Sequence, residues 1–333
     1  MTNKLENIGF YTLTDERAKN SSLTSPMKRC ELILLEACNF RCSYCRGLKD
    51  YIYGDRQKKQ LSLEEVKRNI DYWCENQSLE NIRFSGGEPT LHSNIKEIVD
   101  YAKSKGIKRI AISTNGSSKF ELYEELIKLG VNDFSISLDA NNSEDGDKMA
   151  GGIKGSWNIV IDNIEKISKL TYVTVGIVLN EMNIDSTIDT IILANKLGVS
   201  DIRIISAAQY NQTIPRLNEV PQTIKDKYPI LNYRINNFAQ GVNVRGISET
   251  DSHKCGLMLD DSIIAGDFMY NCVIHLREGG RPMGKVGPNM RKERYDFMQT
   301  FDTHKDPICK KNCLDICKFF NNKYEEYHGD NTL

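Results

Sequence analysis

The chain has 333 residues, of which 40% are hydrophobic, and its formal net charge is −1 because 44 Lys and Arg are balanced by 45 Asp and Glu. This balance gives no support to a nucleic-acid or membrane partner, and no apolar run reaches the ~18 residues of a membrane span. The polar start, residues 1–20, lacks the apolar core of a signal peptide. We therefore expect a cytoplasmic protein whose ten cysteines are metal ligands or catalytic groups rather than disulfides.

Between residues 31 and 208, strand-like segments alternate with amphipathic helical segments. Ser62 with Glu65 forms a capping box, Ser93 is a second expected N-cap, and Gly130 is a stop signal. In chain order we expect strand 31–37, helix 62–76, strand 81–87, helix 93–106, strand 107–116, helix 119–130, strand 133–140, helix 156–170, strand 172–180, helix 185–198 and strand 201–208. Six strands joined by helices predict a parallel sheet, which right-handed crossovers would curl into a partial barrel.

The pattern changes after about residue 240. Strand–helix alternation fades there, and five of the ten cysteines lie between Cys255 and Cys317. The fold class expected is α/β, a partial (β/α)6 TIM-like barrel with a smaller C-terminal cysteine-rich domain. The expected domains are an N-terminal extension at 1–27, the barrel at 28–240 and the cysteine-rich domain at 241–333.

Three cysteines, Cys38, Cys42 and Cys45, follow the first predicted strand with the spacing C-x3-C-x2-C. In parallel β/α barrels this edge carries the active site. Thiolates suit iron–sulfur clusters or zinc, and three ligands leave one coordination position open. A structural zinc site completed by a distant Cys or His is the alternative. The long segment 45–60 would serve as a cover for the site.

The second predicted strand ends in "FSGGEP", residues 84–89, at the same edge. Paired glycines allow a ligand to approach the backbone closely. The C-x3-C-x-aromatic-C pattern, with Tyr44 in the aromatic place, followed by GGEP resembles the radical S-adenosylmethionine (SAM) superfamily over roughly residues 30–210.

The resemblance implies a [4Fe–4S] cluster held by Cys38, Cys42 and Cys45, with SAM on the fourth iron. It also implies a set of SAM contacts at the strand ends. These are Tyr44 near the adenine; Gly86, Gly87 and Glu88 at the amino group; Ser113, Asn115, Ser137, Asp139 and Asn180 along the methionine and ribose; and Lys148 or Lys154, in place of the more usual Arg, at the carboxylate.

The resemblance further implies the reaction type. A one-electron donor such as flavodoxin or ferredoxin reduces the cluster, SAM is cleaved to methionine and a 5′-deoxyadenosyl radical, and that radical removes hydrogen from a substrate. The protein positions the radical and excludes water and oxygen. No catalytic acid, base or hydrogen donor can be assigned from the sequence.

The C-terminal cysteines resemble the SPASM or twitch extensions of some radical SAM enzymes. Gly266 precedes Cys272 by five intervening residues instead of the usual four, and the later cysteines are spaced C-x3-C-x3-C. These departures favour one auxiliary [4Fe–4S] cluster over two. Four of five cysteines would bind it: Cys255, Cys272, Cys309, Cys313 and Cys317. Zinc and inert thiols are the alternatives, and we expect Cys30 and Cys74 to be structural.

The substrate class stays open at this point. We expect a peptide or small molecule, although only about 30 residues precede the first strand, too few for a peptide-recognition domain. Modification of a nucleotide or nucleic-acid base is the alternative within the same chemistry. A non-catalytic iron–sulfur or zinc-binding protein is the alternative from a different class.

Overall fold

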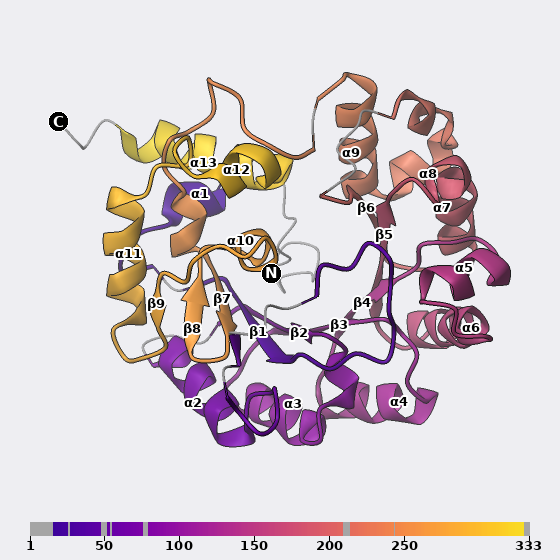
Figure 1. The fold of residues 1–333 in the computed structure, drawn as a ribbon, viewed down its shortest axis with the longest axis horizontal. Helices are drawn as coiled ribbons and strands as arrows, with labels where there is room; N and C mark the ends of the chain where they lie inside the picture. The colour runs from indigo at the N-terminus through magenta and orange to yellow at the C-terminus, as the bar shows by residue number, and fades with distance from the viewer. Residues whose placement is uncertain are drawn as a thin grey trace. The chain divides into compact units, whose positions relative to one another are not determined.

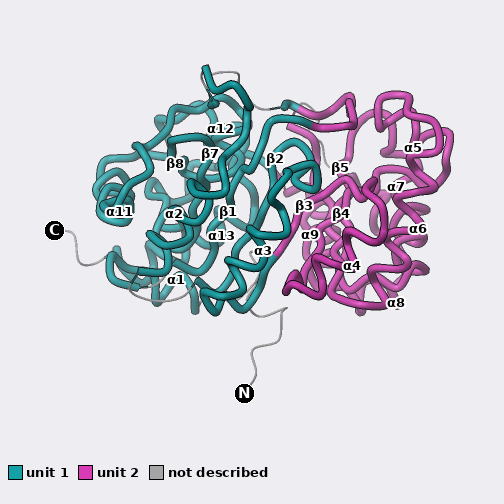
Figure 2. The backbone as a smooth tube through the Cα atoms, turned by 90° about the horizontal axis from the view of Figure 1, so that it is seen from below, with its two compact units in different colours: residues 1–37, 46–110, 245–333 teal, residues 38–45, 111–244 magenta. Residues whose placement is uncertain are grey.

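A computed structural model describes residues 16–25, 27–47, 52–53, 55–75, 79–208, 214–242 and 244–329 (Figure 1). Most of the expected N-terminal extension and part of the expected cover at 45–60 lie outside these ranges. The chain divides into two compact units: unit 1 is 1–37, 46–110 and 245–333, and unit 2 is 38–45 and 111–244 (Figure 2). No helix among the described residues is long and apolar enough to cross a membrane.

Unit 1 is built on five strands in the order β2-β1-β7-β8-β9. Their bounds are β1 Arg29–Leu35, β2 Asn81–Gly86, β7 Asp261–Ala265, β8 Phe268–Tyr270 and β9 Gly284–Lys285. β1 pairs in parallel with both β2 and β7, so every residue of β1 is buried. Arg29, the first residue of β1, is buried. Its Nη2 forms an ion pair with Oδ2 of Asp261 on β7 at 2.7 Å.

Helices cover this sheet and carry the C-terminal cysteines. They are α1 Glu16–Asn20, α2 Leu63–Cys74, η3 Pro89–Leu91, α3 Ile95–Ser104, η6 Gly256–Leu259, α10 Val273–Arg277, α11 Met290–Thr300, α12 Pro307–Asn312 and α13 Asp315–His328. α2 and α3 lie side by side (Figure 1), and Tyr101 of α3 donates a hydrogen bond to Asp71 of α2 at 2.7 Å.

Unit 2 contains parallel strands in the order β3-β4-β5-β6. Their bounds are β3 Arg109–Thr114, whose first two residues count with unit 1, β4 Asp133–Ser137, β5 Tyr172–Leu179 and β6 Asp201–Ser206. The helices are α4 Phe120–Leu129, α5 Ser143–Met149, α6 Ser156–Ser168, η4 Ile184–Ser186, α7 Thr187–Lys196, η5 Pro215–Glu219, α8 Gln222–Lys227 and α9 Pro229–Ala239. In the described part of either unit, the strands do not close into a full barrel.

The α/β class with parallel strands is confirmed, and the capping box of Ser62 and Glu65 is present at the start of α2. The second helix begins later than expected, because Asn94 and not Ser93 occupies the cap position of α3. Sequence reasoning did not predict α5, a short polar helix, or the parallel pairing of β7 with β1. The three expected domains stay a prediction.

Candidate functional site

The loop with the first three cysteines lies in unit 2 and is fixed by contacts on both sides. Asn115, just after β3, donates to Asn39 Oδ1 at 2.9 Å and reaches Cys38 Sγ at 3.9 Å. The backbone N–H of Arg41 donates to the carbonyl of Ala150, after α5, at 3.0 Å. The loop is therefore anchored to the ends of β3 and α5.

The cysteine loop is electrostatically unfavourable as a set of free thiolates. Burial, followed by the charges of the neighbouring Asp139, Cys45 and Cys38, raises the pKa of Cys42 to about 12. A bound cation reverses this balance, because metal coordination deprotonates a thiol outright. The soft donors and their mutual proximity therefore fit the positive iron core of an iron–sulfur cluster.

Tyr44, the aromatic residue of the cysteine motif, is hydrogen-bonded to Asp139. The Tyr44 hydroxyl donates to one carboxylate oxygen of Asp139, and the N–H of Val178 on β5 donates to the other at 2.7 Å. Burial raises the pKa of Asp139 to about 6, although both hydrogen bonds act to lower it. This carboxylate thus ties the cysteine loop to β5, a role that the strand-end prediction did not foresee.

Several predicted SAM contacts converge on one small cavity in unit 2. Its lining includes Cys42, Tyr44, Asn115, Ser137 and Asp139, and its volume is about 70 Å³. The cavity therefore marks a place in unit 2 where these residues meet.

The remaining predicted contacts of unit 2 lie elsewhere. Lys148 and Lys154 are exposed and are not among the residues that line this cavity. The side chain of Asn180 donates to the carbonyl of Val178 and accepts from the N–H of Met182, both at 2.9 Å. Ser113 lies half-buried near the end of β3. The SAM contacts of these four residues, like those of the residues that line the cavity, stay a prediction.

The glycine pair lies in unit 1, pressed against the end of β1. A Cβ on Gly86 would lie 2.4 Å from the carbonyl oxygen of Leu35, and one on Gly87 would lie 2.2 Å from that of Ala37. The N–H of Gly87 donates to Leu35 at 2.9 Å, and the N–H of Glu88 donates to Ala37 at 2.8 Å. Only glycines permit this approach, which fixes the pair next to the residue that precedes Cys38.

Glu88 is fully buried, and its carboxylate is used locally. It accepts hydrogen bonds from the N–H of Thr90 at 3.1 Å and from the Thr90 hydroxyl at 2.6 Å, which caps η3. The side chain thus shapes the turn after the glycine pair. The predicted SAM contact of residues 86–88 stays a prediction.

The five C-terminal cysteines lie at or near helix ends in unit 1. Cys255 precedes η6, Cys272 caps α10, Cys309 lies in α12, Cys313 follows α12, and Cys317 lies in the first turn of α13. Asp306 caps α12 and accepts from the N–H of Cys309 at 2.7 Å.

These five thiols lie within electrostatic range of one another. Burial, followed by the charge of Cys272, raises the pKa of Cys255 to about 12. Burial, followed by charges on neighbouring cysteines, also raises the pKa values of Cys309, Cys313 and Cys317. Five thiols whose charges disfavour one another's ionisation again fit a positively charged metal cluster better than free thiolates.

No three His, Cys, Asp or Glu side chains of the described ranges converge on a point that could hold a single metal ion. In a [4Fe–4S] cluster each thiolate binds a different iron, so its ligands need not meet at one point. Cys30 is fully buried in β1 and Cys74 is half-buried at the end of α2, in agreement with structural roles.

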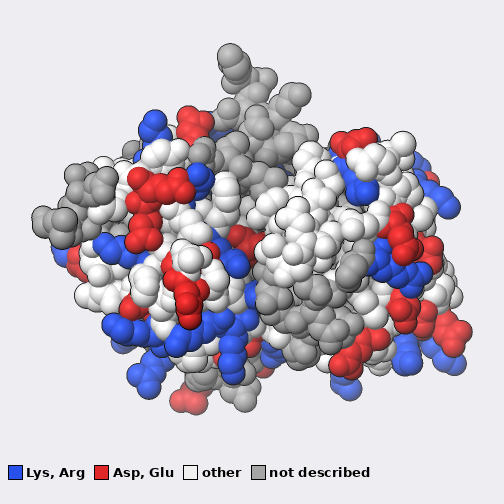
Figure 3. Space-filling model, turned by 90° about the horizontal axis from the view of Figure 1, so that it is seen from above, with Lys and Arg blue, Asp and Glu red and all other residues white. Residues whose placement is uncertain are grey.

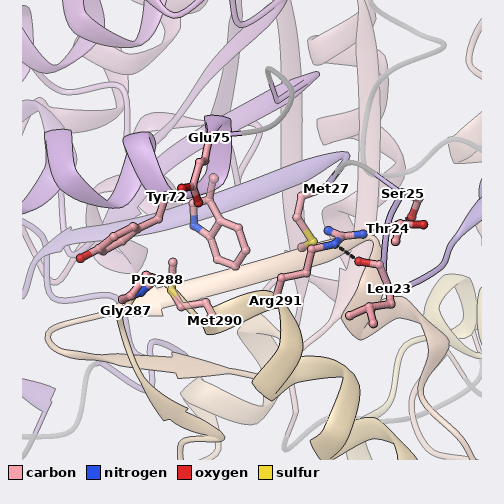
Figure 4. Close-up of a pocket in the computed structure, with 11 residues that line it drawn as sticks. Leu23, Thr24, Ser25, Met27, Tyr72, Glu75, Gly287, Pro288, Met290 and Arg291 are labelled. Carbon is pink, nitrogen blue, oxygen red and sulfur yellow. Dashed lines mark hydrogen bonds between the residues drawn. The ribbon is translucent and has the colours of Figure 1, made fainter.

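A larger cavity of about 540 Å³ lies apart from all predicted site residues (Figure 4). It is in unit 1, and its lining includes Met27, Tyr72, Trp73, Glu75 and Met290. Arg291 also lines this cavity, and its Nη2 donates a hydrogen bond to the backbone carbonyl of Ser22 at 2.7 Å. No sequence motif marks this cavity.

Basic and acidic side chains are both spread over the face drawn in Figure 3, in keeping with the net charge of −1. Sequence reasoning also missed Asn39 and Arg41, two loop residues whose contacts with Asn115 and Ala150 anchor the cysteine loop. Only their position between Cys38 and Cys42 could have indicated them.

Comparison with known proteins agrees with this geometry. Residues 32–194 match the family model of the radical SAM superfamily. The chain is 31% identical over 172 residues to mycofactocin maturase MftC of Mycolicibacterium smegmatis, covering 50% of this chain and 41% of that protein. It is 32% identical over 143 residues to GTP 3′,8-cyclase of Haemophilus ducreyi, covering 42% of this chain and 41% of that protein. The matches span about two fifths of the length of these two relatives.

The fold is shared with SuiB of Streptococcus suis, whose structure was solved bound to the precursor peptide SuiA. The TM-score is 0.62 at 13% sequence identity, over 90% of this chain and 72% of that one. This similarity confirms the predicted partial-barrel fold class. With its family match, its cysteine loop and its glycine pair, the chain belongs to the radical SAM superfamily.

Proposed function

We propose that the chain is a radical SAM enzyme that abstracts hydrogen from a peptide or small-molecule substrate with the help of one auxiliary [4Fe–4S] cluster. The observation that carries this proposal is the three-cysteine loop of unit 2, whose thiols disfavour each other's ionisation. The glycine pair of unit 1, packed directly on Leu35 and Ala37, supports it.

In this proposal Cys38, Cys42 and Cys45 hold the first cluster, and the backbone of Gly86, Gly87 and Glu88 binds the amino group of SAM. When bound, the reduced cluster supplies the electron that cleaves SAM to methionine and a 5′-deoxyadenosyl radical. Tyr44 and Asp139 hold the cysteine loop on β5. A small one-electron donor protein of the flavodoxin or ferredoxin type supplies the reducing equivalent.

Four of the five C-terminal cysteines hold the auxiliary cluster. Two observations support this. Burial and the charges of neighbouring cysteines raise the pKa of Cys313, and Cys272 and Asp306 cap α10 and α12. When bound there, this cluster would supply a binding position for substrate or an acceptor for one electron.

The printed names of similar proteins support a peptide as the first candidate substrate. SuiB was solved with a precursor peptide, and MftC is named a maturase. A nucleotide is the second candidate, favoured by the 32% identity to a GTP 3′,8-cyclase.

The test is iron and sulfide per chain after anaerobic reconstitution of the wild type and of a Cys38→Ala, Cys42→Ala, Cys45→Ala triple variant. We expect about eight irons, the content of two [4Fe–4S] clusters, to fall to about four. Four falling to none would remove the auxiliary cluster from the proposal. An unchanged iron content would refute the assignment of the first cluster.

A further inference from the structure

α10 joins the C-terminal cysteines to the glycine pair of the proposed SAM site. This helix, Val273–Arg277, begins at its cap Cys272, whose sulfur accepts a hydrogen bond from the N–H of His275 at 3.4 Å. It ends at Arg277, only five residues later. A helix of five residues is about 7.5 Å long, so one short rigid element carries a proposed cluster ligand at one end and a guanidinium at the other.

Arg277 contacts two backbone segments of unit 1. Its Nη2 donates to the carbonyl of Gly86 at 2.7 Å, and its Nη1 donates to the carbonyl of Gly47 at 3.0 Å. The next residue, Glu278, forms an ion pair with Arg46. Arg46 and Gly47 follow Cys45 directly in the sequence, so the end of α10 contacts both the glycine pair and the segment that leaves the cysteine loop.

The contact with Gly86 fixes the orientation of a peptide group. A peptide is planar, and its C=O and N–H point in opposite directions. In the peptide that joins Gly86 to Gly87, the C=O accepts from Arg277 and the N–H donates to Leu35 at 2.9 Å. Glycine has the widest choice of backbone conformations, so this peptide would rotate easily if one of the two partners were removed.

The other residues of α10 hold the helix in place. Leu276 is fully buried in a core cluster with Ile33 of β1 and Ile263 of β7. His275 Nε2 lies 3.3 Å from a carboxylate oxygen of Asp306. The Asp306 carboxylate also accepts a hydrogen bond from the N–H of Cys309. A change in the metal content of the cysteines therefore acts on the same helix that positions Arg277.

We propose that Arg277 is a positioning residue that orients the Gly86–Gly87 peptide for SAM and couples SAM binding to metal loading of the C-terminal cysteines. This inference rests on the proposed function. The guanidinium acts through the backbone of Gly86, and its planar fork donates to two carbonyls from two separate nitrogens.

The experiment measures SAM dissociation constants of the reconstituted full chain by anaerobic equilibrium dialysis. We expect Arg277→Met to weaken SAM binding about tenfold, roughly the cost of ordering the backbone of one released residue when SAM binds, and Arg277→Lys to give a smaller loss. Arg281→Met is the matched control, since Arg281 is exposed and lies four residues further on. We expect SAM affinity to be unchanged in this control.

A second readout needs neither cluster nor SAM. In the iron-free chain, we expect hydrogen exchange of the segment 84–91 to be faster in Arg277→Met than in the wild type, because the Gly87 N–H loses its fixed geometry. We expect Arg281→Met to exchange at the wild-type rate. Equal exchange in all three proteins would overturn the positioning role. If Arg277→Met does not fold, the positioning role is tested with Arg277→Lys instead, through its SAM dissociation constant and the hydrogen exchange of the segment 84–91.

The coupling is tested by Cys272→Ser, which removes a thiolate but keeps an oxygen able to cap α10. We expect it to weaken SAM binding in the wild-type background and to have no further effect in Arg277→Met. Equal effects in both backgrounds would refute the coupling. If the wild type binds no SAM, the proposed function fails; if it binds SAM and Arg277→Met binds equally well, only this inference fails.

Discussion

Replacement of Gly87 by alanine tests the backbone packing that brings the glycine pair to the end of β1. The added Cβ would lie 2.2 Å from the carbonyl oxygen of Ala37 and 2.3 Å from that of Glu36. Both obstacles are backbone atoms, which cannot rotate away as a side chain can. The loop after β2 must therefore move from the end of β1.

The expected cost follows from three contributions. Overpacking against fixed atoms costs about 1–3 kcal/mol. Weakening of the two hydrogen bonds from the N–H groups of Gly87 and Glu88 costs about 0.5–1.5 kcal/mol each. The reduced entropy of the unfolded alanine chain returns about 0.4–1 kcal/mol. We expect a net loss of about 3 kcal/mol, within a range of about 1–6 kcal/mol, in the free energy of unfolding of unit 1.

The chain has two tryptophans, one in each unit, so tryptophan fluorescence can follow the unfolding of one unit at a time. Trp73 lies in unit 1 and Trp157 in unit 2, so a Trp157→Phe background leaves Trp73 as the reporter of unit 1. Urea unfolding of the iron-free chain is followed by fluorescence, with m-values compared to verify that the transitions are equivalent.

Gly287→Ala is the matched control in the same unit, because no atom lies within 4 Å of the Cβ it would add. We expect the control to stay within about 0.5 kcal/mol of the parent. A Gly87→Ala variant as stable as Gly287→Ala would refute the argument that the glycines are required by close backbone approach.

Two further predictions concern the cysteine loop. Cys42→Ala is expected to abolish 5′-deoxyadenosine formation from SAM while leaving the circular dichroism unchanged, and retained cleavage would contradict the cluster assignment. Asp139→Asn is expected to change the pH dependence of unfolding, measured through Trp157 in a Trp73→Phe, iron-free background. Burial raises the pKa of Asp139 to about 6 in the folded chain, above about 3.9 when unfolded. Its stabilising contribution is therefore present below about pH 4 and lost as the pH rises through 6, by at most about 3 kcal/mol; parallel pH profiles for the two proteins would contradict this.

The local signals of the sequence determined most of the strand and helix order between β1 and β6. Alternating apolar periodicity, glycine stops and the Ser62–Glu65 capping box are short-range features, so they could be recognised without tertiary structure. The C-x3-C-x2-C spacing and the GGEP stretch likewise indicated both halves of the candidate site, because their chemistry depends on residue type and spacing.

Only the tertiary structure decided how distant segments meet. β7 carries a short apolar run that nothing in the sequence assigns to β1, because strand pairing depends on which edge the folded sheet leaves open. The hydrogen bond from Tyr44 to Asp139 and those from Arg277 to Gly47 and Gly86 join residues that are 95, 230 and 191 positions apart. Spacing along the chain carries no information about such contacts. Residue chemistry thus determined what the site contains, and long-range packing decided which side chains hold it in place.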